Sequence, residues 1–183
     1  MPRMFIAIEP TGAVKTALAA LRLDMPGCKW TPLEQIHLTL RFLGDVSPGA
    51  AKALQYSLAN IRVAPFELLV RGVGTFPGFG SRQHPRVLWA GVAPAAGLEQ
   101  LWREINAAAN QLKLEGDESA RGFAPHLTIA RLKGKPAPQL AGLIRRNEHF
   151  TAPVMAAREF VLFESELRRE GAVHRPVETF ELL

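Results

Sequence analysis

The stretch His37-Leu38-Thr39-Leu40-Arg41-Phe42-Leu43-Gly44 alternates in side-chain character and predicts a strand over Ile36–Leu43 that ends at Gly44-Asp45. A near copy, His126-Leu127-Thr128-Ile129-Ala130-Arg131-Leu132-Lys133-Gly134, follows later in the chain and predicts a second strand. With five His and eight Thr in 183 residues, composition alone predicts roughly 0.2 His-x-Thr matches. Two are present, so we interpret the pair as a repeated element.

Side chains two residues apart on a strand point to the same face. In the first copy His37 and Thr39 therefore emerge together, while the aliphatic residues between and after them turn to the core. His126 and Thr128 repeat this arrangement. If the two halves of the chain are similar, an approximate two-fold axis brings both faces into one cleft that holds two imidazoles and two hydroxyls.

Outside the repeat, helices and strands alternate irregularly, which is typical of the α+β class. Helices are predicted after the N-cap candidates Thr11 and Ser47, over Leu98–Leu112 and over Gln139–Arg146. Further strands are predicted over Phe5–Ile8, Phe66–Val70, Val87–Val92, Phe150–Met155, Glu159–Phe163 and Val177–Leu182. Two loops are predicted, over Gly72–Pro85 and Gly116–Gly122.

The composition describes a globular chain that can bury a core: 48% of the residues are hydrophobic, and 21% are charged, with a net charge of +5. The length predicts one domain over residues 1–183, built from two small lobes. No apolar stretch approaches the roughly 20 residues of a membrane span, and no signal peptide is recognisable. Cys28 is the single cysteine, which excludes an internal disulfide and a Cys-based zinc site and favours a cytoplasmic location.

Two imidazoles facing one phosphate suit phosphoryl transfer without a metal. A displacement at phosphorus needs a base for the nucleophile and an acid for the leaving oxygen, on opposite sides of the phosphorus. Histidine can serve in either role near neutral pH, and a Thr hydroxyl can donate to the non-bridging oxygens. A single His-x-Thr on a strand is more often structural, but the same pair occurring twice favours the functional interpretation.

The doublet resembles the signature of the 2H phosphoesterase superfamily, and the chain is similar to the bacterial and archaeal RNA 2′,3′-cyclic phosphodiesterases, also called 2′-5′ RNA ligases. The resemblance extends over nearly the whole chain. Besides the two motifs it includes the stretches at 3–8, 85–89, 123–131 and 163–165. One departure is His174, where relatives often have Tyr, which puts a nucleotide contact at that position in doubt.

The resemblance implies a bilobal α+β fold with antiparallel sheets around a central cleft and helices outside. It also implies a reaction that opens an RNA 2′,3′-cyclic phosphate to a 2′-phosphomonoester, with His37 as the proton donor to the 3′ oxygen and His126 as the base that activates water. The reverse reaction would form a 2′-5′ bond. Because the two motifs are nearly symmetric, the sequence itself leaves these two roles interchangeable.

Five further residues are candidates for substrate contacts. Strict alternation places Arg131 on the face opposite His126, although a bulge could bring it to the cleft. By the same parity Arg41 lies on the Thr39 face, where it is a phosphate ligand or a solvated strand residue, and Phe42 faces the core unless it stacks on a base. Arg86, beside the loop at 72–85, and His174 complete the set.

No cofactor is predicted, since the His and carboxylate spacing fits no zinc motif and no glycine-rich phosphate loop is present. The expected partner is an RNA end with a 2′,3′-cyclic phosphate, such as a tRNA fragment. The protein is expected to be a monomer and to have no contact with membranes. Two alternatives stay open: a module that binds RNA ends without turnover, and a 2H hydrolase of a small cyclic nucleotide such as ADP-ribose 1″,2″-cyclic phosphate.

Overall fold

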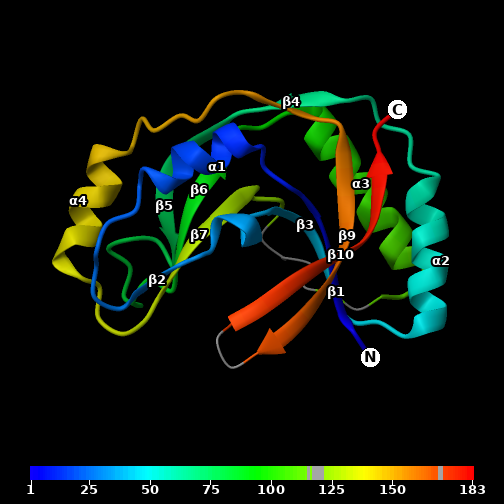
Figure 1. The fold of residues 1–183 in the computed structure, drawn as a ribbon, viewed down its shortest axis with the longest axis horizontal. Helices are drawn as coiled ribbons and strands as arrows, with labels where there is room; N and C mark the ends of the chain where they lie inside the picture. The colour runs from blue at the N-terminus through cyan, green and yellow to red at the C-terminus, as the bar shows by residue number, and fades with distance from the viewer. Residues whose placement is uncertain (115, 117–121, 169–170) are drawn as a thin grey trace.

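A curved antiparallel sheet organises the molecule (Figure 1). The computed structural model describes residues 1–114, 116, 122–168 and 171–183. The strands follow the order β10-β9-β1-β3-β7-β6-β5, with β2 paired to β7, and a separate small sheet pairs β4 with β8. Their bounds are β1 Arg3–Ile8, β2 Cys28–Trp30, β3 Leu38–Asp45, β4 Phe66–Leu68, β5 Val70–Phe76, β6 Val87–Val92, β7 His126–Leu132, β8 Met155–Ala157, β9 Glu159–Arg168 and β10 Gly171–Glu181.

The large sheet consists of two halves, which form the two lobes. One half holds β10, β9, β1 and β3, and the other holds β7, β6, β5 and β2. Among the described residues, Leu38 and Leu127 are the one pair that joins β3 to β7. Since the strands and helices mix in irregular order around antiparallel pairs, the predicted α+β class is confirmed.

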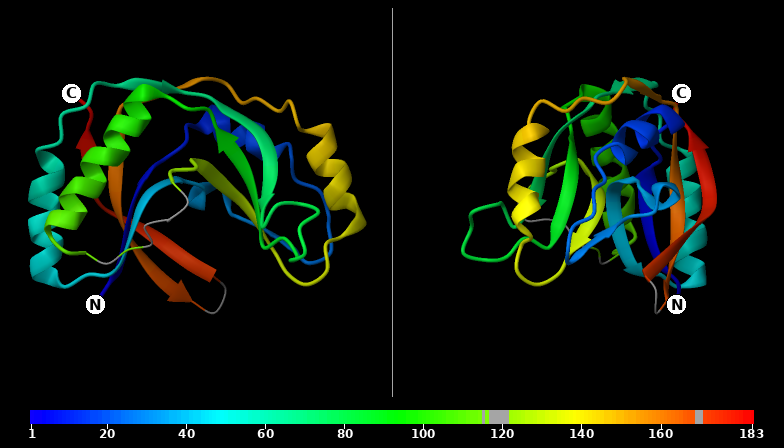
Figure 2. Two further views of the ribbon diagram at one scale, coloured as in Figure 1. Left: turned by 180° about the vertical axis from the view of Figure 1, so that it is seen from behind. Right: turned by 60° about the vertical axis from the view of Figure 1, so that its left-hand side comes forward.

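Four α-helices and a 3₁₀ turn accompany the sheet in the described part of the chain. They are α1 Gly12–Ala19, η1 Leu33–Gln35, α2 Pro48–Ala59, α3 Ala96–Gln111 and α4 Pro138–Arg146. Helix α3 packs on β3 and on α2, so a helix that lies between β6 and β7 in the chain covers the other half of the sheet. Figure 1 places α4 at the opposite end of the molecule, and the views in Figure 2 agree.

Local sequence signals define the helix starts. Ser47 accepts a hydrogen bond from the backbone N–H of Ala50 at 3.3 Å, and Pro48 occupies the first helical position, as predicted. Thr11 also precedes its helix, but its side chain makes no capping hydrogen bond. None of the helices in the described residues is long and apolar enough to cross a membrane.

The loop predicted over Gly72–Pro85 is wrong in its first part, because β5 continues to Phe76. Residues 70–76 pair with β6, and Gly72 adopts a φ of +70° where the register shifts. Glycine tolerates this conformation at little cost, so the glycines here mark an irregular strand rather than its absence. The remaining residues, 77–85, form the loop.

Three other strand predictions need correction. Phe66–Val70 is interrupted at Leu69 and contributes to β4 and to β5. Over Phe150–Met155 only an isolated bridge at Thr151 forms before β8 begins, and Pro153 has no N–H to donate to a ladder. The last strand begins at Gly171, well before the predicted Val177. The loop predicted over Gly116–Gly122 lies, between its two ends, outside the described residues.

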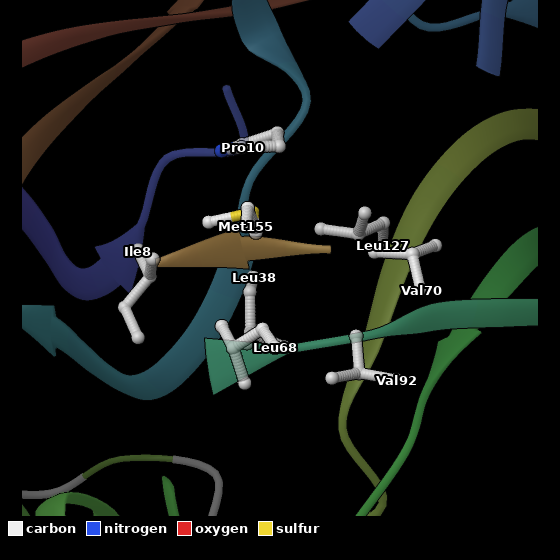
Figure 3. Close-up of a pocket in the computed structure, with 8 residues that line it drawn as sticks. All are labelled: Ile8, Pro10, Leu38, Leu68, Val70, Val92, Leu127 and Met155. Atoms are coloured by element: carbon white, nitrogen blue, oxygen red, sulfur yellow. The ribbon is translucent and has the colours of Figure 1, made fainter. Parts of the chain in front are cut away.

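The lobes meet over an apolar junction beneath the Leu38–Leu127 pair. Figure 3 shows the side chains that surround a void there: Ile8, Pro10, Leu38, Leu68, Val70, Val92, Leu127 and Met155. The void measures about 10 Å³, so it has room for roughly one water and no polar side chain to hold it. Both leucines are 2% exposed, so the face that carries them is the core face.

Candidate active site

The two motifs meet at the junction of the lobes. Leu38 and Leu127 are paired and point into the core, so the residues on either side of each leucine point to the opposite face. These four neighbours are His37, Thr39, His126 and Thr128. The strands run antiparallel at this pair, so the His of each motif lies on the same side of the pair as the Thr of the other motif.

Both catalytic candidates are held by the same local hydrogen bond. His37 Nδ1 lies 2.8 Å from the carbonyl oxygen of Gln35, and His126 Nδ1 lies 2.8 Å from the carbonyl oxygen of Ala124. A carbonyl can only accept, so Nδ1 carries the proton in each ring. In the neutral imidazoles Nε2 is therefore the basic nitrogen.

A bulge in each motif strand changes the faces that strict alternation predicts. In β3, Ile6 pairs with Arg41 while Ala7 pairs with Thr39, so Leu40 is an additional residue. Leu40 and Arg41 are both buried, and the next side chain, Phe42, returns to the His face with 50% exposure. The predicted faces of Arg41 and Phe42 are therefore both wrong.

The second motif strand has its bulge at the equivalent position. Leu88 pairs with Ala130 and Trp89 with Thr128, which leaves Ile129 as the additional residue. Ile129 and Ala130 are both buried. Because of this bulge, which was considered possible from the sequence, Arg131 lies on the same face as His126. Its side chain is exposed. Arg131 and Phe42 occupy the same position of their motifs, five residues after each His.

Arg41 points away from the candidate active site and joins β3 to α3. It is 4% exposed and donates to Asn106 Oδ1 at 2.5 Å, to Asn110 Oδ1 at 3.1 Å and to the carbonyl oxygen of Leu114 at 3.4 Å. These contacts give both terminal nitrogens of the buried guanidinium an acceptor. The predicted phosphate-binding or solvated role of Arg41 is therefore corrected to a structural one.

Aromatic rings surround His37 on the first lobe. The Phe5 ring centroid lies 4.7 Å from that of His37, and Phe163 stacks on Phe5 at 5.0 Å. His174 meets His37 edge-on at 5.1 Å, and its backbone N–H donates to Gln35 Oε1 at 3.0 Å. The candidate His174 thus lies in the site, beside the predicted proton donor.

His126 has its own aromatic neighbours on the second lobe. The Phe76 ring lies edge-on to it at 5.0 Å and contacts Trp89 at 5.4 Å. Trp89 covers Gly74, where any Cβ would overlap the indole ring, so glycine is required at this close approach. Phe76 is not among the predicted site residues, because the glycines around it predict a loop there.

Positive charge and burial act on His37. Its pKa is lowered from 6.5 to about 4, chiefly by desolvation and to a smaller extent by the charges of His174, His126 and Arg131, while the hydrogen bond to the Gln35 carbonyl opposes the shift. Burial and then Arg131 also lower the pKa of His174. His37 is therefore neutral at pH 7, and only about one molecule in 10³ holds its second proton.

Several groups at the site have hydrogen-bonding capacity to spare. Within the described ranges, the hydroxyls of Thr39 and Thr128 make no hydrogen bond, and Arg131 has no carboxylate partner. Arg86 is exposed next to Val87, which pairs with Arg131, so it lies at the edge of the site. The described residues contain no cluster of three or more potential metal ligands. The arrangement offers two imidazoles and several hydrogen-bond donors to one anion.

The chain is similar to known proteins over almost its whole length. A family model described as LigT like Phosphoesterase matches residues 8–89 and 92–174. An RNA 2′,3′-cyclic phosphodiesterase of Archaeoglobus fulgidus is 30% identical over 182 residues, which is 98% of this chain and 99% of the relative. A protein of the same name from Geobacillus stearothermophilus is 35% identical over 171 residues, covering 90% of this chain and 52% of the relative.

Solved structures show the same fold. TT0787 of Thermus thermophilus superposes with a TM-score of 0.80 at 31% identity, covering 98% of this chain and 97% of that one. E. coli LigT complexed with 3′-AMP gives 0.76 at 27% identity, covering 99% and 98%.

The fold and the matches define an enzyme class, the 2H phosphoesterases. Within that class, this chain belongs to the LigT-like phosphoesterase family, which confirms the resemblance seen in the sequence.

Proposed function

We propose that this protein hydrolyses the 2′,3′-cyclic phosphate of RNA ends to a 2′-phosphomonoester without a metal. The observation that carries the proposal is the matched pair of imidazoles, each fixed through Nδ1 and placed on one face by the Leu38–Leu127 pair. The names of the relatives support the substrate class, since those from Archaeoglobus fulgidus and Geobacillus stearothermophilus are RNA 2′,3′-cyclic phosphodiesterases.

In the proposed mechanism each His uses Nε2, because Nδ1 is held by a carbonyl. His126 Nε2 accepts a proton from water, and the water oxygen forms the new bond to phosphorus. The bond from phosphorus to the 3′ oxygen breaks, and His37 Nε2–H gives its proton to that oxygen. One proton enters at His126 and one leaves from His37, so a proton exchange with solvent restores both rings.

The acid role requires His37 to gain a proton on binding substrate. Its pKa of about 4 in the free protein results from desolvation and from neighbouring positive charge. A cyclic phosphate beside the ring adds a negative charge and offsets Arg131, and both effects favour the imidazolium. Substrate binding thus charges the acid where it is needed.

The remaining polar groups hold the phosphate. Thr39 and Thr128 offer one hydroxyl from each lobe to the non-bridging oxygens, and Arg131 offers a fork that matches two oxygens. Phe42 offers an exposed ring on the same face for a base.

We include in the proposal a single domain over residues 1–183, a monomeric state, a cytoplasmic location and RNA fragments such as those of tRNA as substrates. The same site run in reverse would join a cyclic end to a 5′-hydroxyl.

An assay with an oligonucleotide that ends in a 2′,3′-cyclic phosphate, in the presence of EDTA, tests the function. We expect turnover that falls at least 10²-fold in His37→Ala and in His126→Ala, with folding intact by thermal melting. His149→Ala is the matched control, because His149 is exposed and contacts only Glu148 among the interactions of the described residues.

Full activity in either catalytic variant, or a strict requirement for added metal, would contradict the proposal. Tight binding of the oligonucleotide without turnover by the wild-type protein would instead favour the RNA-binding alternative.

A further inference from the structure

A polar pocket of about 130 Å³ lies beside His37 on the first lobe. Its lining includes Glu9 after β1, Glu34 and Gln35 of η1, Phe163 of β9, and His174 of β10. The pocket is continuous with the active-site residues through His37 but has no part in the proton transfers described above.

The charge of this pocket differs from that of the phosphate site. Glu9 and Glu34 are exposed carboxylates, and in the described part of the chain neither makes a hydrogen bond or an ion pair. Two unneutralised carboxylates repel a phosphate and attract hydrogen-bond donors. Together with the two imidazoles they form no metal-binding cluster within the described residues. The pocket therefore suits an uncharged group that presents N–H donors.

The other walls favour a flat group. Ile36, Phe163 and Pro176 add apolar surface to the lining. Gln35 is held in place at both ends, because its backbone carbonyl accepts from His37 and its Oε1 accepts from the His174 backbone. Gln35 Nε2 keeps two hydrogens for a ligand. A planar heterocycle with donors and acceptors at its edge matches these walls.

The proposed reaction determines which part of the substrate lies in this pocket. If His37 protonates the 3′ oxygen, the ribose that carries the cyclic phosphate lies on the His37 side of the phosphorus, and its base lies on that side too. We propose that this pocket binds the nucleobase of the terminal nucleotide, and that Glu9 and Glu34 select bases with adjacent N–H donors. The inference rests on the proposed function, including its assignment of His37 as the acid.

Guanine is the base that fits the carboxylates best, because its N1–H and N2–H groups lie side by side and can reach both oxygens of one carboxylate. Uracil is the poorest fit, since its single N–H is flanked by two carbonyl oxygens. The substrate preference should therefore follow the donors on the base rather than its size alone.

The test compares guanosine and uridine 2′,3′-cyclic phosphates as substrates. We expect kcat/KM to be about tenfold higher for guanosine in the wild-type protein. In Glu9→Gln, Glu34→Gln and the double variant, the ratio should fall toward one, mainly through KM. Glu67→Gln on β4 is the matched control, an exposed Glu outside this pocket, and should keep the wild-type ratio.

Equal kcat/KM values for the two nucleotides, or a ratio that both variants and the double variant leave unchanged, would overturn the inference. Titration calorimetry with guanosine and uridine 2′-monophosphates makes the same comparison without turnover. A failure of hydrolysis with preserved guanosine preference would therefore contradict the proposed function alone, whereas hydrolysis without preference would contradict the base pocket alone.

Discussion

At the scale of single residues, two backbone carbonyls decide what the histidines can do. Gln35 and Ala124 hold Nδ1 of His37 and His126, which leaves Nε2 of each ring for chemistry. The environments of the two rings then differ: His37 packs against Phe5 and His174, whereas His126 has Phe76 at its edge. Near-identical motifs thus acquire unequal surroundings, which is what separate acid and base roles require.

The low pKa of His37 predicts a loss of folding stability in mild acid. In the unfolded chain the ring titrates near 6.5, and in the folded protein near 4. Between these values the unfolded state binds more protons, so the contribution of His37 is fully present above pH 6.5 and is lost as the pH falls through 4. A pKa difference of this size corresponds to about 3 kcal/mol.

Urea denaturation of the wild-type protein and of His37→Gln between pH 7.5 and 4 measures this contribution. The wild-type protein should lose more stability than the variant, and an NMR titration should show the His37 pKa rising when inorganic phosphate binds. Parallel pH profiles for the two proteins would contradict the assigned burial of His37.

At the scale of elements, the bulges explain where sequence reasoning succeeded and where it failed. Alternation was enough to place His37 and Thr39 on one face, since both precede the bulge in their strand. It failed for Arg41 and Phe42, because a bulge depends on the partner strand's hydrogen bonds, which no local pattern encodes. Phe76 follows glycines that predict a loop, although they lie in strand β5. The strand is irregular between Arg71 and Val73, and Gly74 leaves room for the Trp89 ring.

The Arg41 contacts predict that α3 depends on β3 for its attachment. Arg41→Ala removes a buried guanidinium and leaves Asn106 and Asn110 without their donor, so we expect about 2–4 kcal/mol less stability. The kcat/KM value should stay within a few-fold, because the side chain faces away from the histidines. Denaturation and activity assays check this, with exposed Arg145→Ala on α4 as the control. A large loss of activity with little loss of stability would restore a substrate role for Arg41.

At the scale of the whole molecule, the junction of the lobes determines how the two motifs face each other, because Leu38 and Leu127 each directly follow a histidine of the proposed catalytic pair. Leu127→Ala enlarges the apolar void of Figure 3 and should cost about 2–5 kcal/mol. It should also lower kcat, since the lobes repack around the cavity and move His126 relative to His37. Leu127→Met, which nearly conserves volume, should restore both values in large part. Wild-type kcat in a clearly destabilised Leu127→Ala would show that the junction does not position the histidines.

The net charge of +5 is a property of the whole molecule, and we expect it to make kcat/KM depend on salt only for a long substrate. In the proposed function a cyclic mononucleotide contacts only the phosphate site and the base pocket, whereas an oligonucleotide continues past the edge of the site, where Arg86 is exposed next to Val87, the strand partner of Arg131. Each further phosphate contact should steepen the slope of log kcat/KM against log salt by about 0.7.

A salt series on a cyclic-ended decanucleotide and on the matching cyclic mononucleotide measures the two slopes. We expect the decanucleotide to be the more salt-sensitive, and Arg86→Gln to reduce its slope by about 0.7 while the mononucleotide slope stays unchanged. Arg145→Gln, an exposed arginine on α4, should alter neither slope if the RNA follows the Arg86 edge. Equal slopes for the two substrates would mean that the enzyme holds only the terminal nucleotide, and that the positive charge has no part in binding the rest of the RNA.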